Sequence, residues 1–246
     1  MEYTRECHPA QLENLPSLSV ARTHGILFPV VEQGFTDLVR NLMNEKTKPE
    51  SDRERWNQKY ARGQGPAHFR PSRLLVEHQH LLADSSQQAA GAGVGRRALD
   101  VACGFGGSAL YLASRGYRVD AVDISGVALS QAQAEAQRRG LQLGLVQADL
   151  GRWWVPPGHY DLIIVRYYLN WDLMPELAKG LKPRGLLFLE TWNVHALAAR
   201  PEFDPAYLLH PGELRRFTVD AHLDLIQVAD GTTEDQVSQL IARRPA

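Results

Sequence analysis

The sequence has little cysteine, no long apolar run and almost no net charge. Its two cysteines, Cys7 and Cys103, lie far apart and suggest no disulfide framework, which fits a reducing compartment. A net charge of −1 provides no basic field that would attract nucleic acid. No apolar run approaches the roughly 18 residues of a membrane span, and the polar start lacks the apolar core of a signal peptide. We therefore expect a cytoplasmic protein without nucleic-acid or membrane partners.

The remaining composition is that of an ordinary globular protein. Apolar residues make up 44% of the 246 positions and charged residues 22%. A chain of this length can form one large α/β domain with a short extension, and it needs no disulfide or metal for stability. His78 and His80 are two positions apart, so they do not share a helix face, and we expect no metal site.

The first 48 residues differ in pattern from the rest of the chain. Pro29 suits a helix start, and apolar residues then recur at helical spacing. These residues are Val31, Phe35, Leu38, Val39, Leu42 and Met43. Residues 44–55 are polar and charged, with a proline at position 49, and are interpreted as a linker. We predict an N-terminal extension at 1–48 with one amphipathic helix, serving as a packing arm, a lid or a dimer contact, and a main domain at 49–246.

Residues 98–113 have the pattern of a strand, a glycine turn and a helix. The apolar run 98–102 precedes Gly104, Gly106 and Gly107, and residues 108–113 favour a helix. The spacing Gly104-x-Gly106-x-x-Ala109 fits the fingerprint of a nucleotide-binding βαβ unit, although a plain tight turn would also fit. Glycines let a ligand approach the main chain, and the start of the helix offers free N–H groups.

Strands and helices alternate through the rest of the chain. Further strands are expected at 118–123, 141–146, 160–165, 186–190, 223–228 and 239–243, and further helices after Ser72, after Ser125 and at 174–181. Ser72 and Ser125 are suitable N-caps. This order predicts an α/β fold with a doubly wound, Rossmann-like, mostly parallel sheet that carries helices on both faces.

Acidic residues fall where such a sheet binds its ligand, beyond the carboxyl ends of the strands. Asp123 follows Gly104 by 19 positions, close to the spacing of an acid that binds both ribose hydroxyls, although it could also complement the next helix dipole. Asp100 lies in an apolar strand and needs a partner, which a ligand ammonium would supply and a pyrophosphate would not. Asp149 could accept a hydrogen bond from an adenine amine or could stabilise a loop.

Several segments, in order and with normal spacing, resemble the motifs of class I S-adenosylmethionine-dependent methyltransferases. They are 99–107, 119–125, 147–150, 160–165 and 181–190. Residues 207–214, with Pro-Gly-Glu-Leu, resemble the tellurite-resistance-like branch, and Trp56-x-x-x-Tyr60 is similar to its N-terminal aromatic pair. The resemblance implies a seven-stranded sheet whose last strand is antiparallel, and S-adenosylmethionine as the cofactor.

The same resemblance implies a set of cofactor-binding residues. They are Asp100, Ala102, Gly104, Gly106, Asp123, Ile124, Asp149, Leu150, Arg166 and Trp56. It would place Asp100 near the methionine ammonium, Asp123 at the ribose and Asp149 at the adenine edge. Phe105 and Gly107 stand where related proteins often carry charged residues, which implies a more apolar neighbouring pocket.

The acceptor pocket is expected beyond the fourth and fifth strands, near Tyr167, Tyr168, Trp192 and His195. Aromatic rings there could hold a sulfonium by cation–π contact or could simply pack in the core. We predict methyl transfer to a small molecule by in-line displacement and name no catalytic residue, although His195 could act as a base. The alternatives are a nicotinamide-dependent oxidoreductase and a non-catalytic cofactor-binding module.

Overall fold

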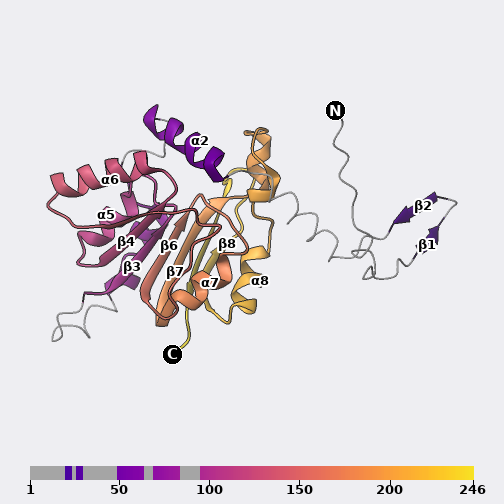
Figure 1. Ribbon diagram of the computed structural model, residues 1–246. Coiled ribbons are helices and arrows are strands. Elements are labelled where there is room, and N and C mark those ends of the chain that lie inside the picture. Colours follow the sequence, from indigo (N-terminus) through magenta and orange to yellow (C-terminus); the bar gives the residue numbers. More distant parts are fainter. Residues whose placement is uncertain (1–19, 24–25, 30–48, 64–68, 84–94) are drawn as a thin grey trace, which may run out of the picture. The chain divides into compact units, whose positions relative to one another are not determined.

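The computed structural model describes residues 20–23, 26–29, 49–63, 69–83 and 95–246 (Figure 1). The chain forms two compact units, Met1–Lys48 and Pro49–Ala246. In the first unit, strands β1 (Val20–Thr23) and β2 (Ile26–Pro29) pair in antiparallel orientation, although their residues show no periodic pattern that would predict strands. The amphipathic helix predicted around residues 31–43 lies outside the described residues.

The second unit is built on a seven-stranded sheet with the order β5-β4-β3-β6-β7-β9-β8. Its strands are β3 (Arg97–Val101), β4 (Arg118–Asp123), β5 (Gly144–Gln147), β6 (Tyr160–Arg166), β7 (Leu181–Trp192), β8 (Asp224–Ala229) and β9 (Val237–Arg243). The last strand, β9, is antiparallel to both of its neighbours, while β5, β4, β3, β6 and β7 pair in parallel. This arrangement confirms the predicted Rossmann-like, mostly parallel sheet.

Helices cover both faces of this sheet, as predicted (Figure 1). They are α3 (Arg73–Glu77), α4 (His80–Ala83), α5 (Gly107–Ala113), α6 (Gly126–Arg138), α7 (Met174–Gly180) and α8 (Glu213–Asp220). Alternation along the central strands supplies two cores. Leu187 and Leu189 of β7 pack with α7 and α8, whereas Leu186 and Phe188 pack with α3, α4 and α5 on the other face.

Some predicted boundaries are shifted. β7 begins at Leu181 rather than at residue 186, and β5 covers 144–147 rather than 141–146. Ser72 caps α3 as predicted, because its side chain accepts a hydrogen bond from the Leu75 N–H at 3.2 Å. The centres of the strands are thus predicted correctly, and the errors lie at the ends, where turn geometry decides the boundary.

The prediction of a linker at 44–55 is wrong for residues 49–55, because they form the first turns of helix α2 (Pro49–Ala61). Pro49 is its first residue, a position that proline favours. The sequence of this helix is mostly polar and has no strong apolar periodicity. Of the side chains that the structure describes, it buries little beyond Trp56 and Tyr60. Figure 1 shows α2 crossing above one edge of the sheet, near α6.

Ser125 joins α2 to α6 and is a sensitive position for stability. Its hydroxyl accepts a hydrogen bond from the Ala128 N–H at 3.2 Å and donates one to Asn57 Oδ1 of α2 at 2.7 Å. We expect Ser125→Ala to lower the free energy of unfolding by about 1–2 kcal/mol, measured by urea denaturation. Ser130→Ala, at an exposed position of the same helix, is the control and should change it by less than about 0.5 kcal/mol. Equal effects of the two substitutions would contradict this role.

Candidate functional site

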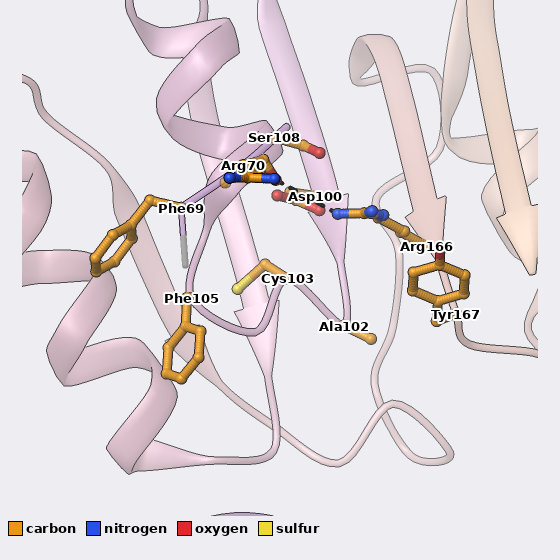
Figure 2. Close-up of a pocket in the computed structure, with 10 residues that line it drawn as sticks. Phe69, Arg70, Asp100, Ala102, Cys103, Phe105, Ser108, Arg166 and Tyr167 are labelled. Atoms are coloured by element: carbon orange, nitrogen blue, oxygen red, sulfur yellow. Dashed lines mark hydrogen bonds between the residues drawn. The ribbon is translucent and has the colours of Figure 1, made fainter. Parts of the chain in front are cut away.

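A cavity lies at the carboxyl ends of β3 and β6, beside the glycine turn (Figure 2). It is lined by Phe69, Arg70, Asp100, Ala102, Cys103, Phe105, Gly107, Ser108, Arg166 and Tyr167. In the sheet, β3 lies between β4 on one side and β6 on the other. The chain passes first to β4 and later to β6, so the cavity lies where the strand order reverses. Open α/β sheets bind their ligands at such a point.

The glycine turn has a backbone that other residues would strain. Gly104 and Gly106 have φ angles of +53° and +73°, in the left-handed region. The Gly106 N–H donates to the Cys103 carbonyl at 2.9 Å, which closes the turn directly before α5. A Cβ added to Gly104 would also lie 2.8 Å from the Tyr60 hydroxyl. Both glycines therefore adopt a backbone that favours glycine, and the approach of a ligand to this turn stays a prediction.

Asp123 is tied to this turn from the end of β4. Its Oδ2 accepts a hydrogen bond from the Gly104 N–H and its Oδ1 one from the Ser125 N–H, each at 2.8 Å. The side chain is buried; burial raises the pKa of Asp123 and these backbone N–H groups oppose the rise. A carboxylate has about four acceptor sites, so two bonds leave acceptor capacity for further donors.

Asp100 is the buried acid of the cavity wall. It is 2% exposed, and its Oδ2 accepts a hydrogen bond from the Ala109 N–H of α5 at 2.8 Å. Burial raises the pKa of Asp100 to about 7, while the Ala109 N–H and the Arg166 guanidinium act in the opposite direction. The sequence predicted that this carboxylate needs a partner, and the Ala109 N–H in the first turn of α5 is one such partner.

Asp149 does not line this cavity. Its Oδ1 accepts a hydrogen bond from the Gly151 N–H at 3.0 Å, in the loop after β5. This is the loop-stabilising role that the sequence left open. Leu150 packs into the core on the α7 side, and Ile124 is half-buried directly after β4. A contact of these three residues with adenine stays a prediction.

Arg166 is held by an ion pair that sequence reasoning missed. Its Nε lies 2.6 Å from Oε1 of Glu190, whose side chain is only 4% exposed. Arg166 and Glu190 are register partners at the ends of the parallel strands β6 and β7, which is the signal that could have revealed the pair. Arg166 also donates to the Arg70 carbonyl at 3.4 Å. It is thereby fixed at the cavity wall, between β7 and the segment that precedes α3.

An aromatic cluster from α2 covers the other side of the glycine turn. The Tyr60 ring meets the Phe105 ring edge-on at 4.9 Å and the Trp56 ring at 5.8 Å, and Phe69 lies 6.0 Å from Phe105. Burial raises the pKa of the Tyr60 hydroxyl well above its ordinary value, and the charge of Asp123 adds to the rise. The sequence analysis includes Tyr60 in an aromatic pair but not among the predicted cofactor-binding residues. Tyr60 and Gly104 are far apart in the sequence, so no local pattern predicts their contact.

The predicted acceptor residues are brought together only in part. Tyr167 lines the cavity and stacks on Trp192, with ring centroids 5.1 Å apart and planes inclined by 20°. Tyr168 packs against the core and its hydroxyl accepts a hydrogen bond from the Asn170 amide at 3.4 Å. His195 lies in the short helix η2 (Val194–Ala198) after β7 and does not line the cavity.

Three residues at the cavity have a strained backbone. Phe69, Ala102 and Tyr167 each have a φ angle of +53°, which costs a non-glycine residue about 1 kcal/mol or more. Ala102 directly follows β3 and Tyr167 directly follows β6, so the chain turns sharply away from the sheet at both points. Such strain concentrates at ligand sites, where the surrounding structure maintains it.

Within the ranges that the structure describes, no group of three or more His, Cys, Asp or Glu side chains is arranged to hold a metal ion. Across the same ranges, no helix is both long enough and apolar enough to cross a bilayer.

Comparison with known proteins points to one enzyme class. Residues 98–185 match the model of a methyltransferase domain family. The chain is 28% identical over 170 residues to ubiquinone biosynthesis O-methyltransferase of Azoarcus sp. (strain BH72), a match that covers 60% of this chain and 72% of that protein. It is 32% identical over 116 residues to malonyl-[acyl-carrier protein] O-methyltransferase of Enterobacter lignolyticus (strain SCF1), covering 45% of this chain and 43% of that one.

The fold agrees with these matches. The structure of magnesium protoporphyrin IX methyltransferase (ChlM) from Synechocystis PCC 6803 with bound S-adenosylhomocysteine superposes with a TM-score of 0.54 at 21% identity, covering 80% of this chain and 100% of that one. The matched domain contains the glycine turn and four parallel strands of the sheet, β3 to β6, with the start of β7. The matched methyltransferase domain and these relatives together identify the chain as an S-adenosylmethionine-dependent methyltransferase.

Proposed function

We propose that the cavity beside the glycine turn binds the methionine end of S-adenosylmethionine and delivers its methyl group to a small-molecule acceptor. The observation that carries this proposal is the placement of two buried acids, Asp100 and Asp123, on the adjacent strands β3 and β4 at the two sides of the turn. Asp100 would hold the ammonium group and Asp123 the ribose hydroxyls, because a carboxylate accepts strong, directional hydrogen bonds from both.

The chain's task in this reaction is mainly alignment. When bound, the cofactor supplies a methyl group on a positively charged sulfur, and the C–S bond breaks with its electron pair on sulfur while the acceptor's lone pair forms the new bond. Fixing the two reactants in line can lower the barrier by about 7–11 kcal/mol. Arg166, fixed by Glu190, and Tyr167, fixed against Trp192, are rigid groups that would shape the methyl end of the cavity. An acceptor that carries a proton would release it to water.

The acceptor and the narrower family placement are also proposals. The relative named ubiquinone biosynthesis O-methyltransferase and the half-buried rings of Tyr167 and Trp192 support a small-molecule acceptor over nucleic acid. The tellurite-resistance-like branch is supported by the Trp56–Tyr60 pair on α2 and by the Pro-Gly-Glu-Leu sequence at 211–214. A cytoplasmic location stays a prediction from the sequence. A nicotinamide dinucleotide is disfavoured, because Asp100 would face its pyrophosphate with a like charge.

Isothermal titration with S-adenosylhomocysteine tests the cofactor part of the proposal. We expect saturable binding of one ligand per chain and no heat from NADH under the same conditions. Absence of S-adenosylhomocysteine binding at millimolar concentration would refute the proposal, and binding of NADH alone would favour an oxidoreductase. Binding of S-adenosylhomocysteine without methyl transfer to any metabolite tested would favour a non-catalytic cofactor-binding module.

The affinity for S-adenosylhomocysteine should depend on pH through Asp100. The folded-state pKa of about 7 lies above the ordinary value of an aspartate, so the apo protein binds a proton there below pH 7. An ammonium ligand favours the ionised carboxylate, so binding must release this proton. We expect the affinity to fall by up to about tenfold per pH unit between pH 7 and 5, measured by calorimetry. In Asp100→Asn the affinity should be lower and this part of the pH dependence absent; an unchanged pH profile would contradict the assignment.

A further inference from the structure

A row of aromatic side chains extends from the cavity along the carboxyl ends of β6 and β7. This aromatic row consists of Tyr167, Trp192 and Phe203. Trp192 stacks on Tyr167 at 5.1 Å and meets Phe203 edge-on at 5.7 Å. Tyr167 belongs to the cavity wall, so the row continues the proposed methyl site toward the surface. Its rings are half-buried and offer an apolar, planar lining.

Arg200 closes the outer end of this row. Its exposed guanidinium lies 4.5 Å from the Trp192 ring centroid and 5.4 Å from that of Phe203. Stacking uses the faces of the guanidinium and leaves its N–H edge free to donate in a fixed fork that matches a carboxylate. Arg200 therefore packs over aromatic rings rather than against an acid.

A second cation approaches from α2. Lys59 Nζ lies 4.4 Å from the Trp56 ring centroid. The pKa of Lys59 is lowered by burial, by the nearby Arg55 and by Arg200, which means that the charge of Arg200 acts on Lys59. The charges of these two cations, which come from different elements, thus repel one another, and a bound anion would relieve this repulsion.

The neighbouring acids form no ion pair with these two cations. Asp52 pairs with Arg55 at 2.9 Å, and Asp204 accepts the Ala206 N–H at 2.9 Å as the cap of the short helix η3 (Pro205–Tyr207). Glu202 follows Arg200 by two positions and is exposed. Among the ion pairs of the described residues, none includes Lys59, Arg200 or Glu202.

We propose that the methyl acceptor is a planar aromatic molecule that carries a carboxylate, with its ring along the aromatic row and its carboxylate bound by Arg200 and Lys59. This inference rests on the proposed function, because it uses the cavity at Tyr167 as the methyl site. It restricts the acceptor to aromatic acids, and it predicts that the protein binds these acids more tightly than their neutral amides. Arg200 and Lys59 are the specificity-determining residues and take no part in holding the cofactor.

The test compares matched acids and amides on the protein saturated with S-adenosylhomocysteine. The probes are hydroxylated benzoates and cinnamates and the corresponding carboxamides, titrated calorimetrically, with methyl transfer from labelled S-adenosylmethionine as a second measurement. We expect at least one acid to bind about tenfold more tightly than its amide, as for a charged hydrogen-bond pair. Arg200→Gln and Lys59→Gln should each remove most of this preference, while Arg216→Gln, exposed on α8, should retain it.

The possible results distinguish a failure of the aromatic-acid inference from a failure of the proposed function. If S-adenosylhomocysteine does not bind, the proposed function fails. If it binds normally but no acid binds more tightly than its amide, including the case in which neither binds, the aromatic-acid inference is overturned alone. It is also overturned if Arg200→Gln and Lys59→Gln keep the wild-type preference for acids. Unchanged affinity of both variants for S-adenosylhomocysteine excludes misfolding as the cause of a loss.

Discussion

Replacing Asp123 by alanine is expected to lower the affinity for S-adenosylhomocysteine by at least about 100-fold, because the ribose would lose a charged acceptor and the glycine turn would lose its anchor. In the folded protein Asp123 accepts the N–H groups of both Gly104 and Ser125. The substitution would therefore remove the proposed ligand contact and loosen the glycine turn beside it. Calorimetric titration measures the affinity, and urea denaturation measures the accompanying loss of stability.

Two variants separate these effects. Asp123→Asn keeps the shape and one acceptor oxygen, so it should fold better than Asp123→Ala but still bind the ligand weakly. Asp120→Ala removes an acid from the same strand whose partners, Arg97 at 3.4 Å and the Tyr160 hydroxyl at 3.2 Å, belong neither to the glycine turn nor to the cavity lining. It should lower stability and leave the ligand affinity within about threefold of wild type. Equal losses of affinity in Asp120→Ala and Asp123→Ala would refute a specific role for Asp123.

The second large effect is expected from Gly107→Ala. Gly107 is the first residue of α5, and helix propensity alone would favour alanine there. A Cβ at this position, however, would lie 2.2 Å from the Arg70 carbonyl oxygen and 2.6 Å from its carbon, which are backbone atoms that cannot rotate away. The segment before α3 would have to shift, which would disturb the bonds from the Ser72 N–H to Ser108 and from Arg166 to Arg70. We expect a loss of about 2–3 kcal/mol in unfolding free energy and weaker ligand binding.

Gly126→Ala is the matched control for this prediction. Gly126 is also the first residue of its helix, α6, and the three atoms nearest to a Cβ there all belong to the end of the Gln147 side chain, the closest at 3.2 Å. Because that side chain can move, the substitution should be neutral or stabilising by up to about 1 kcal/mol. Urea denaturation of both variants measures the difference. Similar stabilities of the two proteins would show that the contact between Arg70 and Gly107 is not tight.

The alternation of strands and helices along the chain, and with it a sheet covered by helices on both faces, could be predicted because it depends on local signals. The buried strand 160–165 has no polar alternation, Gly104 and Gly106 mark the turn, and Ser125 marks a helix start. These signals survive in a single sequence because each is set by a few adjacent residues. The positions of Asp100 and Asp123 follow from them, since the acids stand at fixed offsets from the turn.

The covering of the site could not be predicted in the same way. Helix α2 is mostly polar, so its first residues resemble a linker in the sequence, and only the folded chain brings Tyr60 to Gly104. The hydrogen bond between Arg166 and the Arg70 carbonyl joins residues 96 positions apart, and no local pattern marks such a contact. The carboxylate of Asp149 bonds Gly151, and sequence alone does not separate such a loop-stabilising aspartate from a ligand-binding one, because both have the same signature.

A crystal structure of the protein with S-adenosylhomocysteine tests the role of the two acids most directly. We expect both ribose hydroxyls within hydrogen-bond distance of the Asp123 carboxylate and the ammonium group within that distance of Asp100. We also expect the sulfur to face the side of the cavity that Tyr167 lines. A ligand bound elsewhere on the sheet edge, or bound at the glycine turn with neither acid in contact, would contradict the claim that these two carboxylates hold the cofactor.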